Sequence, residues 1–121
     1  AGHVIVEDKV FLSALVGVHQ FVRIGKYAMI AGLAGVNQDV LPFSTVEGNR
    51  ARLLSANAVG LKRANFKPDV RAAIKKALKF LAQPEQNTKQ AIEKIETEIE
   101  IFDEIQYLIN FVKNSSRGVT K

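Results

Sequence analysis

The sequence has no cysteine, no tryptophan and only three prolines among its 121 residues. Without cysteine the chain has no disulfide scaffold, no thiol nucleophile and no cysteine-ligated metal. This composition suits a reducing cytoplasm, which is the compartment we expect. No run approaches the roughly 18 apolar residues that cross a bilayer, so we expect no membrane span. Because the chain begins at Ala1 without a methionine, we also expect residues upstream of it.

Common catalytic motifs are also absent. The chain has no Gly-x-Ser-x-Gly elbow and no Gly-Lys-Ser/Thr phosphate loop, so neither serine catalysis nor nucleotide hydrolysis is supported. Its two histidines, His3 and His19, lie sixteen residues apart without clustered cysteines or paired carboxylates. They do not make a convincing metal shell, and we expect neither a metal nor a cofactor.

Positive charge is in excess but is not concentrated. The formal net charge is +5. Residues 1–66 hold seven Lys and Arg against four Asp and Glu, and residues 67–121 hold ten against eight. Neither half is a basic tail, so the charge does not demand nucleic acid as a partner.

What the sequence does contain is a repeat of six residues. Branched aliphatic residues occupy every sixth position, namely Val6, Leu12, Val18, Ile24, Ile30 and Val36. Apolar or small residues follow four positions after the first five of them, namely Val10, Val16, Val22, Ala28 and Ala34. Neither a helix nor an ordinary strand keeps two such series in phase. The pattern predicts a three-sided parallel β-helix whose first aliphatic position points into the prism.

The repeat also predicts corners and a longer prism. Gly17, Gly25, Gly32 and Gly35 lie inside it, and we expect them at tight bends. Only about two coils are present, whereas repeat architectures generally need at least three units. We therefore expect residues 1–43 to be the last coils of a longer β-helix.

The rest of the chain divides into a connector and a helical domain. The repeat stops after Val36, and residues 44–66 are predicted to be a connecting loop with a short strand. Residues 67–121 are predicted to form a small all-α domain, because apolar residues recur at helical spacing after Pro68. Residues 88–113 contain no Gly or Pro, so one long helix and two helices, the second capped by Asp103, both remain open.

Five short segments resemble the motifs of one family, in that family's order, and together they span the chain. They are Ala1-Gly2-His3-Val4, Val18-His19-Gln20-Phe21, Gly35-Val36-Asn37-Gln38-Asp39-Val40, Gly60-Leu61-Lys62-Arg63 and Ser116-Arg117-Gly118. The family is that of the UDP-N-acetylglucosamine O-acyltransferases, hexapeptide-repeat enzymes of lipid A biosynthesis. The resemblance implies the end coils of a left-handed parallel β-helix followed by a small all-α domain. It also implies a homotrimer with active sites between neighbouring prisms, and transfer of a 3-hydroxyacyl chain from acyl carrier protein to UDP-N-acetylglucosamine.

The resemblance implies roles for individual residues. The backbone N–H of Gly2 matches the donor that stabilises the oxyanion. Gly32 matches the position that sets acyl length, where a bulky side chain would close the groove. The residues implied to bind the nucleotide sugar are His3, His19, Gln20, Asn57 and Arg63. Among them, the Arg63 guanidinium can meet phosphate oxygens with two donors.

The chain departs from the family pattern at the nucleotide site and at the catalytic base. Val59 and Ala64 stand where polar or charged nucleotide contacts are expected. The family's general base is a histidine about one coil before the position of His3, which would lie upstream of Ala1. We therefore expect the 121 residues alone to be inactive.

Lys67, Arg71, Lys75 and Lys79 recur every four residues and predict a basic stripe on the first long helix. The stripe is either a solvated face or a docking surface for acyl carrier protein, an acidic partner. Two other functions remain open for the whole chain. One is a non-catalytic interaction module, and the other is a related hexapeptide acyltransferase with a different acceptor.

Overall fold

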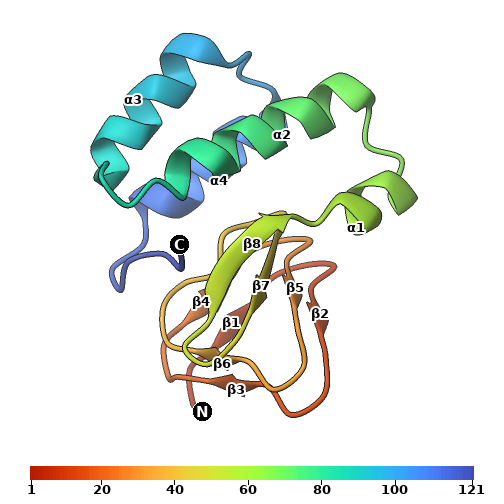
Figure 1. Ribbon diagram of the computed structural model, residues 1–121, viewed down its shortest axis with the longest axis vertical. Coiled ribbons are helices and arrows are strands. Elements are labelled where there is room, and N and C mark those ends of the chain that lie inside the picture. The colour runs from red at the N-terminus through yellow and green to blue at the C-terminus, as the bar shows by residue number, and fades with distance from the viewer.

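The computed structural model describes residues 1–121 as a coil of short strands that carries a group of helices on one side (Figure 1). Six two-residue strands come first: β1 (Ile5–Val6), β2 (Phe11–Leu12), β3 (Gly17–Val18), β4 (Arg23–Ile24), β5 (Met29–Ile30) and β6 (Gly35–Val36). Two longer strands follow: β7 (Ser44–Glu47) and β8 (Arg52–Ala56). The helices are α1 (Ala58–Arg63), α2 (Pro68–Leu81), α3 (Thr88–Glu98) and α4 (Asp103–Lys113).

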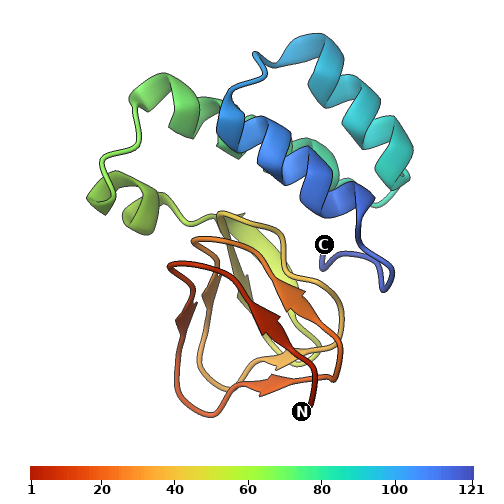
Figure 2. The ribbon, with the colours of Figure 1, turned by 180° about the vertical axis from the view of Figure 1, so that it is seen from behind.

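The short strands pair in parallel with the strand one coil later. Ile5 lies opposite Arg23, Phe11 opposite Met29 and Gly17 opposite Gly35, each eighteen residues apart. The pairs belong to three separate sheets, which form the three walls of the coil seen from behind in Figure 2. The predicted six-residue spacing and parallel pairing are therefore present.

Parallel pairing continues beyond Val36, where the six-residue repeat stops, and beyond residue 43, the predicted end of the last coils. Val40 forms a parallel bridge with Ile24, and β7 pairs with β5 so that Thr45 lies opposite Met29. Both offsets are sixteen residues instead of eighteen, so this last coil is shorter and breaks the period without ending the ladder. Strand β8 then pairs antiparallel with β7 and leads into α1.

The inward aliphatic series is buried in the second coil and uncovered in the first. Ile24 and Ile30 are fully buried, whereas Val6 is 47% exposed and Leu12 is 43% exposed. All four occupy the same position in the repeat. The difference arises because the second coil is covered on both sides, while no residue of the chain covers the open face of the first.

The left-handed position at each corner of the coil is occupied by a residue with a side chain, not by glycine. A left-handed backbone with φ of 57° to 65° recurs every six residues, at His3, Lys9, Leu15, Phe21, Tyr27 and Leu33. The expectation that glycines form the bends is wrong for Gly17 and Gly35, which lie in β3 and β6, and for Gly25, which precedes a corner. Gly32 does lie at a corner, beside Leu33. Hydrogen bonds between coils hold the strained corners, since the Tyr27 N–H donates to the Asp8 carbonyl at 3.1 Å and the Leu33 N–H to the Ala14 carbonyl at 3.0 Å.

Two of these glycines instead permit close packing. A Cβ at Gly25 would lie 2.7 Å from the backbone nitrogen of Pro42, and a Cβ at Gly35 would collide with the Asn49 side chain. The short last coil thus passes close to the second coil where neither residue has a side chain.

The predicted helical domain is present, and residues 88–113 form two helices. Pro68 and Asp69 lie in the first turn of α2, as predicted. Asn87 and Gln90 form a capping box at the start of α3. The break between α3 and α4 falls at Ile99, which is extended and buried. Phe102 is the N-cap of α4 and Asp103 its first residue, so the predicted cap at Asp103 is off by one position.

The coil and the helices meet through a polar junction as well as apolar contacts. Arg23 donates from Nη2 to the Phe111 carbonyl at 2.7 Å and lies 4.2 Å from the centre of the Phe111 ring. The buried carboxylate of Asp39 accepts from the Arg23 backbone N–H at 2.8 Å and from the Ser115 hydroxyl at 2.7 Å. The Arg23 guanidinium also forms an ion pair with Asp39, at 3.5 Å. These bonds fix the helical domain against one wall of the coil.

No helix in residues 1–121 combines the length and the apolar character that crossing a membrane requires.

Candidate active site

Gly2, His3, His19 and Gln20 share one corner of the coil. Residues 2 and 3 precede residues 20 and 21 by one coil, and the Phe21 N–H donates to the Gly2 carbonyl at 3.3 Å. The His3 ring stacks on the Phe21 ring with centroids 5.0 Å apart. A Cβ built on Gly2 would meet open space, so the backbone there is accessible. The structure thus brings together four of the residues that the resemblance implies.

The C-terminal tail, residues 114–121, completes this corner. The Asp39 N–H donates to the Gly118 carbonyl at 3.0 Å, and the Thr120 N–H donates to the Asp39 carbonyl at 2.7 Å. The Gln38 side chain donates to the Arg117 carbonyl at 3.2 Å. The tail therefore lies against residues that follow His19 and Gln20 by one coil.

Arg117 makes the most specific contact at this corner. Its Nη2 lies 3.0 Å from Nδ1 of His19, and its Nε donates to the Asn37 carbonyl at 3.4 Å. The sequence showed Ser116-Arg117-Gly118 as a motif but gave Arg117 no role. Only the tertiary contact reveals it, because the two residues are 98 positions apart.

Asn57 and Arg63 lie at a different corner, on α1. The Asn57 side chain caps this helix by accepting from the Gly60 N–H at 3.1 Å, and it donates to the Tyr27 carbonyl at 2.8 Å. A Cβ at Gly60 would collide with the Asn57 amide, so this close approach needs glycine. Arg63 is exposed in the last turn of α1. The Asn57 amide thus anchors α1 to the coil, and its role toward a nucleotide stays a prediction.

Gly32 lies at the third corner. A Cβ there would be 3.4 Å from Oγ of Ser13 and 3.5 Å from the Ala14 carbonyl, both ordinary contacts. Within one chain an alanine would therefore fit. The role of Gly32 in acyl length stays a prediction, and Gly2, Asn57 and Gly32 lie at three different corners of the coil.

The four residues of the predicted basic stripe fall into two pairs with different surroundings. Lys67 is the N-cap of α2, and the Arg71 guanidinium donates to the Phe66 carbonyl at 3.1 Å. Lys75 and Lys79 line a hollow of about 290 Å³ between β8 and α2, whose apolar lining includes Leu53 and Leu78. The free cationic ends thus border an apolar groove.

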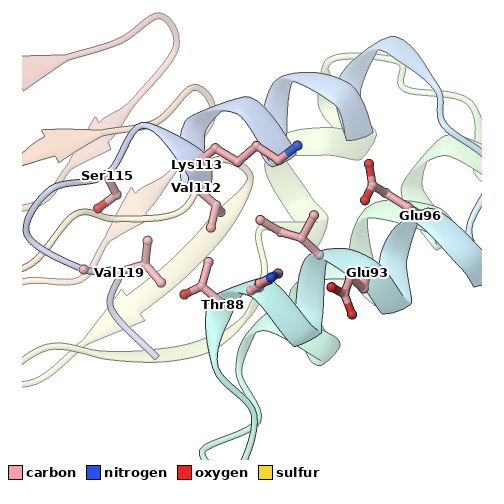
Figure 3. A pocket seen from close by; sticks show the side chains of 10 residues that line it. Thr88, Glu93, Glu96, Val112, Lys113, Ser115 and Val119 are labelled. Carbon is pink, nitrogen blue, oxygen red and sulfur yellow. The ribbon is translucent and has the colours of Figure 1, made fainter.

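A second hollow, of about 490 Å³, lies between α3, α4 and the tail (Figure 3). Glu93 and Glu96 border it from α3 and Lys113 from α4, so its rim carries both signs of charge. None of the site residues predicted from the sequence lines it.

The hydroxyl of Tyr107, on α4 at the junction between the coil and the helices, has a raised pKa. Burial raises the pKa of its hydroxyl, and the hydrogen bond that this hydroxyl donates to the Glu7 carboxylate raises it further. The hydroxyl also accepts from the Lys26 N–H at 3.0 Å. These bonds leave the phenol neutral and make it a junction residue. No cluster of three or more His, Cys, Asp or Glu residues in the chain could hold a metal ion.

Comparisons with known proteins agree with this architecture. A family model described as "Udp N-acetylglucosamine O-acyltransferase; Domain 2" matches residues 39–120. An acyl-[acyl-carrier-protein]–UDP-N-acetylglucosamine O-acyltransferase from Anaeromyxobacter sp. is 40% identical over 95% of this chain and 45% of that protein. A protein of the same name from Nautilia profundicola is 42% identical over 98% of this chain and 46% of that protein.

Solved structures show the same relationship. The UDP-N-acetylglucosamine acyltransferase from Bacteroides fragilis matches with a TM-score of 0.94 and 32% identity, over 98% of this chain and 46% of that one. The chain belongs to the UDP-N-acetylglucosamine O-acyltransferase family, which confirms the resemblance drawn from its motifs. It spans about half the length of the relatives that it matches.

Proposed function

We propose that the chain is the C-terminal part of a cytoplasmic, acyl-carrier-protein-dependent UDP-N-acetylglucosamine O-acyltransferase that carries out the first step of lipid A synthesis. The observation that carries the proposal is the shared corner of Gly2, His3, His19 and Gln20, in a chain that matches a relative of this name over 95% of its length. We further propose that the strands wind as the end of a left-handed β-helix whose earlier coils lie upstream. The uncovered Val6 and Leu12 support this, because another coil would bury them.

In the proposed reaction an upstream histidine removes the proton from a sugar hydroxyl of UDP-N-acetylglucosamine. The hydroxyl oxygen attacks the thioester carbonyl of the acyl carrier, and the Gly2 N–H donates to the oxyanion that forms. The C–S bond then breaks, and the carrier thiol leaves with the proton. Direct transfer needs no covalent enzyme intermediate, and the chain has no cysteine that could form one.

We propose a homotrimer because the implied binding residues occupy different corners of one chain. Asn57 and Arg63 belong to the α1 corner and His19 to another, so a neighbouring prism is needed to bring them to one groove. Exposed apolar corners support this packing: Leu15 is 82% exposed and Leu33 is 69% exposed. Gly32, at the same corner as Leu33, would then border the acyl chain.

The basic stripe is proposed to receive the acidic carrier protein. Lys75 and Lys79 have free ammonium groups over an apolar groove, which suits an acidic helix with an apolar face. Lys67 and Arg71 would extend the positive surface along α2. Attraction of this kind speeds encounter and weakens as salt is added.

Acyl transfer by the full-length protein tests the proposal, with 3-hydroxyacyl carrier protein and UDP-N-acetylglucosamine as substrates. We expect turnover, its loss when the upstream histidine is replaced by alanine, and none from residues 1–121 alone. Turnover that survives removal of the histidine would refute the mechanism. Turnover with another acceptor but not with UDP-N-acetylglucosamine would favour a related hexapeptide acyltransferase, and binding of acidic proteins without any turnover would favour an interaction module.

A further inference from the structure

The C-terminal tail places the Arg117 guanidinium against the His19 ring of the proposed site, and in this pair only one direction of hydrogen bond is possible. Nη2 of Arg117 lies 3.0 Å from Nδ1 of His19. A guanidinium has only donors and does not lose its proton in proteins, so Nδ1 must be the acceptor. The ring proton of a neutral His19 then resides on Nε2.

A second contact of Nδ1 would favour the other tautomer of His19. Nδ1 of His19 also lies 3.3 Å from the Gln20 carbonyl, which can only accept. That bond would require the proton on Nδ1 and leave Nε2 as a bare lone pair. The two contacts exclude each other, and the shorter, charged donor of Arg117 favours the Nε2–H form.

Arg117 is itself held in place at both ends. Its Nε donates to the Asn37 carbonyl at 3.4 Å, and its own carbonyl accepts from the Gln38 side chain at 3.2 Å. Asn37 and Gln38 follow His19 and Gln20 by one coil, so the arginine is anchored to the same corner column. The tail is further tied by the two backbone bonds of Asp39.

We propose that Arg117 is a positioning residue that fixes His19 as its Nε2–H tautomer, so that the exposed edge of the ring donates a hydrogen bond to an oxygen of the nucleotide sugar. This inference rests on the proposed function. His19 is exposed and its Nε2 has no partner within the chain. A deprotonated Nε2 would instead turn a lone pair toward substrate oxygens, and binding would weaken.

Two matched substitutions of Arg117 separate tautomer control from simple packing. In Arg117→Lys the side chain still only donates, whereas in Arg117→Glu it only accepts and draws the proton to Nδ1. We expect the full-length Arg117→Lys protein to bind UDP-N-acetylglucosamine within about threefold of wild type by calorimetry, and Arg117→Glu at least about tenfold more weakly. Ser116→Ala, an exposed neighbour, should leave affinity unchanged. Equal affinities for Arg117→Lys and Arg117→Glu, at equal melting temperatures, would overturn the proposal.

A double-mutant cycle tests whether Arg117 acts through His19. Arg117→Ala should weaken binding about tenfold in wild type but by less than about twofold in a His19→Ala background. The same tenfold loss in both backgrounds would assign Arg117 a direct or purely structural role instead. Histidine-selective ¹⁵N labelling should show the neutral His19 ring protonated at Nε2 in wild type and at Nδ1 in Arg117→Ala, where the Gln20 carbonyl is the remaining partner of Nδ1. A wild-type protein that does not bind the nucleotide sugar would contradict the proposed function, whereas unchanged tautomers in Arg117→Ala would contradict only this inference.

Discussion

The coil and the helical domain bury their apolar residues in different ways. The coil core is a stack of eight buried side chains, most of them β-branched, with one open end. The helical core joins eighteen buried residues from all four helices, the last coil and the tail. The coil repeats a unit that only another unit can cover, whereas the helices cover one another. The helical core is therefore covered within the chain, whereas the coil leaves inward-facing side chains of its first turn exposed.

The largest expected effect compares two positions in one wall of the coil. Ile30→Ala removes a fully buried side chain and should lower the free energy of unfolding of the 121-residue chain by about 2 to 5 kcal/mol. Leu12→Ala, one coil earlier and 43% exposed, should cost less than about 1 kcal/mol in the same chain. Urea unfolding measures both. In the full-length protein the two losses should become similar, and a persistently small loss for Leu12→Ala would show that no coil covers it.

Breaking the junction between the two regions should have the next largest effect. Asp39→Asn removes a buried charge that accepts from Arg23 and Ser115, and should cost about 2 to 3 kcal/mol in thermal or urea unfolding. Asp8→Asn, on the exposed surface of the coil, is the control and should change little. Equal effects would mean that the ion pair does not hold the regions together.

Loss of a helix cap should have a smaller effect, confined to the helical domain. Asn87→Ala removes the capping box of α3 and should cost about 1 kcal/mol. Glu96→Ala, exposed within the same helix, should be nearly neutral. A neutral result for Asn87→Ala would show that packing alone fixes the start of α3.

Alkaline pH should produce a smaller and more gradual effect at the junction. The pKa of Tyr107 is raised in the fold above its ordinary value of 10.0, so its contribution is complete below about pH 10 and declines as pH rises further. The unfolded chain loses this proton first, and unfolding is then favoured. Tyr107→Phe should flatten the fall in melting temperature above about pH 10, whereas an unchanged fall would place the titrating group elsewhere.

Much of the fold could be predicted because the buried apolar residues repeat at regular spacing along the sequence. The six-residue series located β1 to β6 correctly, and helical spacing after Pro68 located the helical domain. The parallel strand β7 escaped prediction because its offset from β5 is sixteen residues, so Val46 falls out of the period. The corners were assigned to glycine because sequence patterns do not contain the hydrogen bonds between coils that hold Tyr27 and Leu33 at positive φ.

The site could be predicted only in part. The motifs singled out His3, His19 and Gln20, which the fold places at one corner. They did not reveal that the Asn57 side chain anchors α1 to the coil, because the Tyr27 carbonyl to which it donates is thirty residues away. They also left Arg117 without a role. Contacts between residues far apart in the sequence depend on how the tail returns to the coil, and no local pattern encodes that path.

By itself the sequence determined the spacing of the strands, the helical second half and the family, since periodic burial and short motifs are local properties of the chain. The tertiary structure decided which corners carry Gly2, Asn57 and Gly32, where α3 and α4 separate, and that Arg117 meets His19. These features depend on hydrogen bonds and packing between distant segments, whose free energies exist only after the coil and the helices have come together.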